Sequence, residues 1–258
     1  MKTENRQNPR PLSALPELLS IPSGICSVIG SGGKTSLLLS LSLELAKRGR
    51  VILGTSTHIL PFPHCPLVLF SSSGISMRPS AKARILKDSE KEAEVTEISS
   101  CLEAAFSLSP LPILCIGSAA ESGKLSPPPI PWKDFLPYAD YILIEADGSK
   151  RLPLKAHAPW EPVIPEGNAR TIAVIGGSGL GHPIKEAVHR PELFLSILRE
   201  KLSENPSGSE ALTERSPVTE EMAALVLERE ALFDKLLLNQ ADILSASSLS
   251  RFALAFRR

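Results

Sequence analysis

Ile25-Cys26-Ser27-Val28-Ile29-Gly30-Ser31-Gly32-Gly33-Lys34-Thr35 is the stretch that decides the fold. Its first five residues carry no charge and are typical of a buried strand, and the residues behind it up to Arg48 are typical of a helix. Glycine in the turn between them lets backbone N–H groups approach a phosphate, and the helix N-terminus adds partial positive charge. The stretch therefore predicts a strand, a phosphate-binding loop and a helix.

This loop differs from the usual P-loop, in which a glycine and four residues precede Gly-Lys-Ser/Thr. Val28 stands at the place of the first glycine, which leaves the shorter pattern G-x-x-G-K-T from Gly30 to Thr35. A loop of this length is also seen in Mur-type ligases, so nucleotide binding remains compatible with it. We expect Lys34 to reach the terminal phosphates and the Thr35 hydroxyl to bind Mg²⁺. The expected nucleotide-binding residues of the loop are Gly30, Ser31, Gly32, Gly33, Lys34 and Thr35.

Length and composition set limits on the class of protein. The chain has 258 residues, of which 43% are hydrophobic, enough for one large α/β domain. It carries 28 basic and 28 acidic side chains, a balance that argues against nucleic-acid binding. The N-terminus has no apolar signal region, no apolar run is long enough to cross a bilayer, and the four cysteines form no CxxC pair. We expect a cytoplasmic protein with reduced thiols and no membrane contact.

Apolar runs and helical patterns alternate along the chain, which favours a P-loop NTPase-like α/β fold, a three-layer sandwich with a mostly parallel sheet covered by helices. We expect a disordered leader over 1–12 and a single domain over 13–258, with a Pro/Gly-rich insertion around 150–181. Strands are expected over 25–29, 51–55, 67–70, 111–117, 141–145, 171–175 and 236–238. Helices are expected over 34–48, 81–91, 97–108, 132–138, 191–202, 219–230 and 248–256, and loops over 71–80, 125–131 and 204–210.

Two acids, Glu145 and Asp147, follow the apolar run 141–145. Ligands of an open parallel sheet bind at the carboxyl ends of its strands. An acid at that place can hold Mg²⁺ or orient an attacking water. We expect Glu145 and Asp147 to be catalytic together with Lys34, and Asp147 to share the metal ion with Thr35.

The segment Asn239-Gln240-Ala241-Asp242 follows the apolar run 236–238 and is similar to the N-K-x-D guanine motif. In that motif the Asp carboxylate accepts two hydrogen bonds from guanine that adenine cannot supply. Gln240 replaces the lysine of the motif, and Asn and Asp are also common in turns after strands. We expect Asn239 and Asp242 to bind the nucleotide, with GTP and ATP both open.

Further polar residues could bind a substrate. His58 ends the segment Thr55-Ser56-Thr57-His58 and could act as a general base, contact a substrate or belong to a capping cluster. Arg190 precedes Pro191 at the start of a helix and could bind phosphate or carboxylate bidentately, or lie on the surface. Lys150 stands next to the acids and could meet an anionic substrate or balance the acidic charge. We expect His58, Lys150 and Arg190 to contact the substrate.

In this order the motifs resemble the YqeC-type accessory proteins linked to selenium-dependent molybdenum hydroxylases. The resemblance runs from about residue 20 to about 245, and its departures are Ser56 and Gln240. It implies a P-loop-like protein that helps to make or install a selenium-containing molybdenum cofactor. The segments that carry it are 28–35, 55–58, 145–150, 153–155, 161–165, 189–192 and 239–242.

We expect a Mg²⁺-dependent nucleoside triphosphatase that uses GTP or ATP in the maturation of a molybdenum hydroxylase, with that enzyme or its cofactor as partner. One alternative is an ATP-dependent ligase or kinase with a Mur-like short loop, which would transfer the γ-phosphate to a bound substrate. Another is a non-catalytic, nucleotide-gated binding module whose acids only hold the metal ion.

Overall fold

The computed structural model describes residues 15–63, 65–71, 74–78, 98–204 and 212–256. The expected leader over 1–12 and the expected helix over 81–91 lie outside these residues. The same is true of most of the loop expected over 204–210.

The described part of the chain contains strands and helices in alternation. Its strands are β1 (Gly24–Gly30), β2 (Val51–Thr55), β3 (Leu67–Ser71), β4 (Gly74–Arg78), β5 (Ile113–Ala119), β6 (Leu125–Ser126), β7 (Tyr141–Glu145), β8 (Leu154–Lys155), β9 (Asn168–Gly176), β10 (Val188–His189) and β11 (Lys235–Asn239). Its α-helices are α1 (Leu15–Leu18), α2 (Lys34–Leu45), α3 (Ile98–Leu108), α4 (Ile184–Ala187), α5 (Pro191–Glu204), α6 (Glu220–Glu230) and α7 (Ala246–Ala255).

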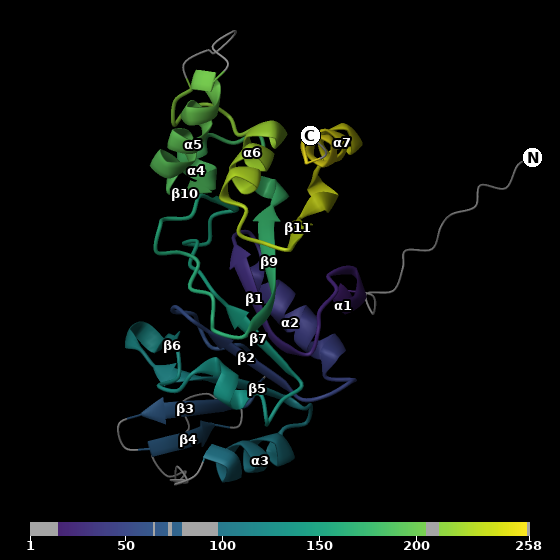
Figure 1. Cartoon of the computed structure of the whole chain (residues 1–258), viewed down its shortest axis with the longest axis vertical. Helices are drawn as coiled ribbons and strands as arrows, with labels where there is room; N and C mark the ends of the chain where they lie inside the picture. Colours follow the sequence, from purple (N-terminus) through teal and green to yellow (C-terminus); the bar gives the residue numbers. More distant parts are fainter. Residues whose placement is uncertain (1–14, 64, 72–73, 79–97, 205–211, 257–258) are drawn as a thin grey trace, which may run out of the picture.

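The main sheet has the order β11-β9-β1-β7-β2-β5-β3-β4, with β6 paired to β5. From β11 to β3 neighbouring strands are parallel, and β4 and β6 are antiparallel to their partners. Figure 1 shows the strand direction turning strongly from β9 to β4, the twist expected of such a sheet. This confirms the expected α/β class with a mostly parallel sheet flanked by helices.

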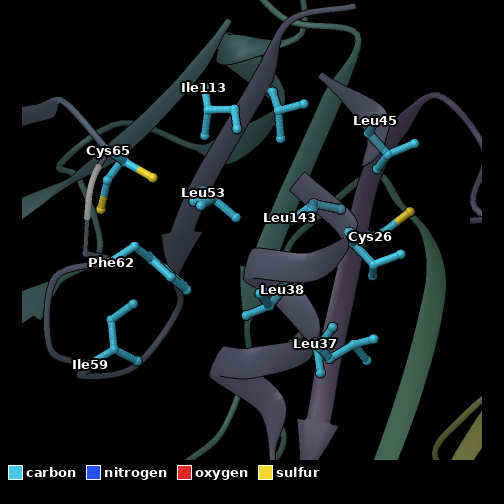
Figure 2. Packing of buried hydrophobic residues seen from close by; sticks show 14 of the residues in the cluster. Cys26, Leu37, Leu38, Leu45, Leu53, Ile59, Phe62, Cys65, Ile113 and Leu143 are labelled. Carbon is cyan, nitrogen blue, oxygen red and sulfur yellow. The ribbon is translucent and has the colours of Figure 1, made fainter. Parts of the chain in front are cut away.

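Alternate residues of β1 face opposite sides of the sheet. Cys26 and Val28 belong to the hydrophobic cluster that includes Leu37 and Leu38 of α2, and Figure 2 shows Cys26 close to these leucines. Ile25 belongs instead to the cluster that contains residues of α3. Helices thus cover both faces, which explains why the run 25–29 is apolar without alternation.

All four cysteines are buried and free. Burial raises the pKa of Cys115 to about 12 and that of Cys26 to about 12, so both thiols are protonated near neutral pH. Both are fully buried and pack as small core residues.

The expectation of a loop over 71–80 was wrong for part of this stretch. Residues Gly74–Arg78 form β4, which pairs with β3 in an antiparallel register that sets Ser71 opposite Gly74. The physical reason is a short alternation in which Ile75 is buried and Met77 half-buried, while Gly74 has a φ of +135° that suits a tight turn. Serine, glycine and proline in this stretch concealed the alternation.

Other differences are small. The expected loop over 125–131 begins with the two-residue strand β6, and the helix expected over 132–138 is a short 3₁₀ turn, Trp132–Phe135. The helix expected over 34–48 ends at Leu45, and the strand expected over 171–175 extends to Asn168–Gly176. Neither α1 nor α4 was expected, because helices of four residues leave little periodicity to detect.

A second sheet of two strands lies outside the main one. In it β8 pairs in parallel with β10, with Lys155 opposite His189. Leu154 and Val188 pack in a cluster with residues of α4, α5 and α6. Figure 1 shows these helices gathered beyond β9, at the end of the molecule opposite α3. No helix among the described residues is both long and apolar enough to cross a bilayer.

We predict that Gly32→Ala destabilises the fold more than Gly123→Ala does. Both glycines have similar positive φ, +75° and +70°, so each alanine carries the same left-handed strain of about 1–2 kcal/mol. A Cβ at Gly32 would lie 2.4 Å from the Gly176 backbone nitrogen, whereas nothing lies within 4 Å at Gly123. The clash should add about 1–3 kcal/mol, measured as the difference in unfolding free energy in urea. Equal losses would contradict this account of the loop.

Candidate functional site

The loop between β1 and α2 is held in a tight bend by glycines with positive φ, +90° at Gly30, +75° at Gly32 and +138° at Gly33. Two of its N–H groups are used internally: that of Gly30 donates to Asp147 Oδ2 at 2.8 Å, and that of Ser31 donates to Val174 O at 2.8 Å. Gly33 is the N-cap of α2 and makes no side-chain cap hydrogen bond. The N–H groups at the start of this helix are therefore available to an anion.

Lys34 is buried above the loop, with a side-chain exposure of 4%. Its Nζ donates to Gly30 O at 2.6 Å and to Ser149 Oγ at 3.4 Å. It also lies 3.1 Å from Asp147 Oδ1 and 3.7 Å from Glu145 Oε1. The sequence prediction that Lys34 and the two acids belong to one site therefore agrees with the geometry.

Glu145 meets the first turn of α2. The Thr35 hydroxyl donates to Glu145 Oε2 at 2.9 Å, and the Thr55 hydroxyl donates to the Glu145 carbonyl at 2.8 Å. Burial raises the pKa of Glu145, although the charge of Lys34 and the hydrogen bond from Thr35 oppose this effect. The carboxyl group thus lies between the lysine and the hydroxyl of the loop.

Asp147 is fully buried at the centre of the site. Its Oδ2 lies 3.0 Å from Lys155 Nζ and 2.8 Å from His157 Nε2, and also accepts the hydrogen bond from Gly30. Burial alone would raise the pKa of Asp147, but the hydrogen bond from His157 and the charges of Lys34 and Lys155 outweigh it and lower the pKa to about 2. Asp147 is therefore a carboxylate held by charged partners on several sides.

His157 is a functional candidate that the sequence reasoning missed. It lies in an irregular segment whose pattern gives no signal, and the fold alone brings it to Asp147. Its Nδ1 lies 2.7 Å from Glu230 Oε2, and its backbone N–H donates to Glu230 Oε1 at 2.6 Å. Burial lowers the pKa of His157, but hydrogen bonds to Asp147 and Glu230 more than offset this and raise it. The last residue of α6 is thus linked to Asp147 and the glycine loop through the ring of His157.

Asn239 lies against the loop, and its Nδ2 donates to Gly32 O at 2.7 Å. Gly33 must be glycine beside it, because a Cβ there would lie 2.1 Å from the same nitrogen. Gln240 has a left-handed backbone and accepts a hydrogen bond from Ser178 Oγ at 2.7 Å. Asp242 lies exposed in the following 3₁₀ turn. The structure brings Asn239 to the loop and leaves the Asp242 carboxylate in solvent.

The three predicted substrate residues lie in different surroundings. His58 is exposed after β2, and Lys150 is exposed in a turn where its φ is +47°. Arg190 is half-buried, because it pairs with Glu161, which in turn lies 2.7 Å from Lys155 Nζ. Lys155 contacts Asp147, so Arg190 is connected to the central acid through Glu161 and Lys155.

The side chains of the site could hold a divalent ion only if phosphate and water supplied most of its oxygen ligands. No group of three or more His, Cys, Asp or Glu is arranged around a metal position in the described ranges. Thr35 and Glu145 offer two oxygens, and Mg²⁺ in such sites takes its remaining ligands from phosphate and water. The Ser31 hydroxyl is buried without a hydrogen-bond partner among the described residues, and a phosphate oxygen would supply one.

Comparison with known proteins gives two matches. The model of the family described as YqeC protein matches residues 26–192. The chain is 36% identical over 179 residues to "Uncharacterized protein YqeC" of Escherichia coli (strain K12), over 67% of this chain and 60% of that relative. The chain thus spans less than two thirds of the length of this relative. No solved structure matches. The matched family region includes the loop, both acids and Arg190, whereas Asn239 and Asp242 lie beyond it.

We predict that His157→Gln destabilises the protein by about 3 kcal/mol, because removing one partner leaves buried Glu230 without its charge partner. Adding Glu230→Gln should then cost less than the sum of the two single changes, since the unpaired charge is gone. Urea unfolding at neutral pH measures all three variants, with exposed His58→Gln as the matched control. If His157→Gln lowered the free energy of unfolding no more than the control does, the pair of His157 and Glu230 would not stabilise the protein.

Proposed function

The chain belongs to the YqeC family, and from its site we propose that it binds a purine nucleoside triphosphate with Mg²⁺ and hydrolyses it. The observation that carries this proposal is the convergence of Lys34, Thr35 and two acids on one glycine loop at the N-terminus of α2. A turn with an incidental Lys-Thr would not bury its lysine against two carboxylates. The loop from Gly30 to Thr35 would hold the β- and γ-phosphates, and its amides would bind their oxygens.

Hydrolysis in this site would need little covalent participation by the protein. Water would attack the γ-phosphorus, the bond from that phosphorus to the β–γ bridging oxygen would break, and nucleoside diphosphate and inorganic phosphate would leave. The ammonium of Lys34, already fixed by Gly30 O at 2.6 Å, would stabilise the charge that develops on the phosphate oxygens.

The two acids would have different roles. Glu145 contacts Thr35, so these two residues would hold Mg²⁺, which supplies charge neutralisation on the phosphates. Asp147 is surrounded by Lys155, His157 and the Gly30 amide, so we assign it to fixing the loop and Lys34. This proposal moves the metal contact from Asp147, the acid expected from the sequence, to Glu145.

For the base we propose guanine over adenine. The side chain of Asn239 already lies at the loop, and the exposed Asp242 carboxylate follows it within one short turn. An exposed carboxylate is free to accept two hydrogen bonds from guanine, which adenine cannot offer. Asn239 would serve both the loop and the base.

A second candidate is phosphoryl transfer to a substrate, as in a ligase or kinase. The short loop with Val28 at the first glycine position favours it, as does the path of charged contacts from Asp147 to Arg190. In this case Lys150 and Arg190 would bind the acceptor, with His58 at the next strand end. Tight nucleotide binding without turnover would instead indicate a non-catalytic module.

The biological setting that we propose comes from the family resemblance. In it, hydrolysis would drive the delivery of selenium or cofactor to a molybdenum hydroxylase. The printed name of the Escherichia coli relative adds no substrate or partner to this proposal.

We predict that Lys34→Ala abolishes nucleotide turnover. Removal of the ammonium takes away the charge that faces the terminal phosphates, and we expect a loss of at least about 100-fold in rate. Lys47→Ala is the matched control, because Lys47 is exposed beyond the opposite end of α2. Phosphate release with GTP and with ATP, in magnesium and on material shown to be folded by circular dichroism, measures the effect. Unchanged turnover in Lys34→Ala would refute the phosphate-loop assignment.

We predict that Asp242→Asn weakens GTP binding far more than ATP binding. Loss of the charge-assisted hydrogen bonds to guanine should cost about 1–3 kcal/mol of GTP affinity. Calorimetric titration with non-hydrolysable analogues measures this, and Asp134→Asn, also exposed but remote in sequence and in the fold, is the control. An equal effect on both nucleotides would mean that the carboxylate does not read the base.

A further inference from the structure

Trp160 is a large aromatic side chain in the segment between β8 and β9, with 72% of its surface accessible. The other tryptophan, Trp132, is buried in the core at 6%. Exposed tryptophan is unusual in a folded chain unless its ring serves a contact. The proposed roles of Lys34 and Glu145 make no use of this ring.

The Trp160 ring is fixed in place by charged partners. The guanidinium of Arg190 lies 5.6 Å from the ring centroid, a cation–π contact. Two nitrogens of Arg190 pair with the two carboxylate oxygens of Glu161, and Glu161 is fixed again by Lys155 at 2.7 Å. The indole thus contacts a guanidinium that is held in place by Glu161, while most of the indole surface stays open to solvent.

Positively charged side chains lie around His189. His189 lies beside Arg190, and burial together with the charges of Arg190, Lys155 and Lys150 lowers the pKa of His189 against the opposing effect of Glu161. Of these cations, Arg190 and Lys155 are both paired with Glu161. Lys150 is exposed and has no ion pair among the described residues, so its charge is free to meet a ligand.

Lys150 and Arg151 also hold a strained backbone. Both have positive φ, +47° and +64°, although neither is glycine. Such residues cost of order 1–3 kcal/mol each and are concentrated at ligand sites. The turn follows Ser149, which contacts Lys34, so it presents its cations next to the phosphate loop.

The segment that carries Trp160 crosses the carboxyl edge of the sheet. It leaves the end of β9, where Pro153 O accepts from the Gly176 N–H at 2.8 Å, and returns to β7, where the Val163 N–H donates to Ala146 O at 2.9 Å. Asn239, the proposed base contact, ends β11 and pairs with Gly176, so the segment starts beside β11 at Pro153 and then carries Trp160 toward β7.

The geometry points to a second ligand site, formed by Trp160, Arg190, His189 and Lys150, that takes a planar aromatic anion beside the nucleotide. The ring of the ligand stacks on Trp160. The phosphate or carboxylate of the ligand contacts Lys150 and lies near Arg190. This inference rests on the proposed function in one respect: the site is on the acceptor side of the γ-phosphate. It names a substrate class for Lys150 and Arg190, two of the residues that we expected to contact the substrate.

The test uses three probes that separate ring from charge: 1-naphthyl phosphate, glycerol phosphate and 1-naphthol. We expect 1-naphthyl phosphate to bind more tightly than either of the others and to quench the fluorescence of the full chain. Trp160→Ala should weaken its affinity by roughly 5- to 140-fold in calorimetry, and Trp160→Phe, which keeps an aromatic face, should lose less. Lys150→Gln should weaken 1-naphthyl phosphate by up to about fivefold and leave 1-naphthol unchanged.

To test whether 1-naphthyl phosphate binds in the phosphate loop instead, the titration is repeated with Lys34→Ala and, separately, with pyrophosphate present to compete for the loop. Binding of 1-naphthyl phosphate that persists under both conditions supports the second site. Loss of binding in Lys34→Ala, with no effect of Trp160→Ala, would place the probe in the loop and overturn the inference while nucleotide binding stands. Equal affinity of all three probes, or an unchanged affinity in Trp160→Ala, would also overturn it and would leave Trp160 as a protein contact or plain surface. Failure of the proposed function shows separately, as absence of heat with GTP and ATP.

Discussion

The carboxylate of Asp147 is the group on which the rest of the site depends. It is fully buried, accepts the Gly30 N–H at 2.8 Å, and lies within 3.1 Å of the ammonium groups of Lys34 and Lys155. An isolated charge at this depth would be very costly, so its partners must be in place whenever the chain is folded. The fold and the conformation of the glycine loop are therefore coupled through one side chain.

Around Asp147 the charges balance. Among the described residues four basic groups, Lys34, Lys155, His157 and Arg190, face four acidic groups, Glu145, Asp147, Glu161 and Glu230. Desolvation makes such a network a weak source of net stability, but removing one member exposes the full cost of an unpaired charge. Such a network favours one arrangement of the loop over others, which is what a site for a charged ligand requires.

The network also joins parts of the chain that are far apart in sequence. Glu230 ends α6, His157 lies in the irregular segment after β8, and Lys34 begins α2. Arg190 joins the network because β10 pairs with β8, which sets His189, the residue before Arg190, opposite Lys155. The contact between Arg190 and Trp160 thus has the same origin as the arrangement of the loop, and both depend on the packing of α4 to α6 against β9.

The sequence by itself determined the strand, loop and helix around Lys34, the parallel character of the sheet, and the acids after β7. These features come from local rules, because burial on both faces makes a strand uniformly apolar and a tight turn with positive φ needs glycine. The pairing of β4 with β3 was missed for a related reason. The alternation of buried and exposed residues in β4 is short and is surrounded by serine, glycine and proline, which are typical of loops.

Only the tertiary structure decided which acid meets Thr35, which one is enclosed by cations, and that His157, Glu161 and Glu230 belong to the site. Two residues apart on one strand end, Glu145 and Asp147 look equivalent in the sequence. Their different roles follow from neighbours that arrive from β8, β10 and α6, and distances between such segments are set by packing, which no local pattern encodes.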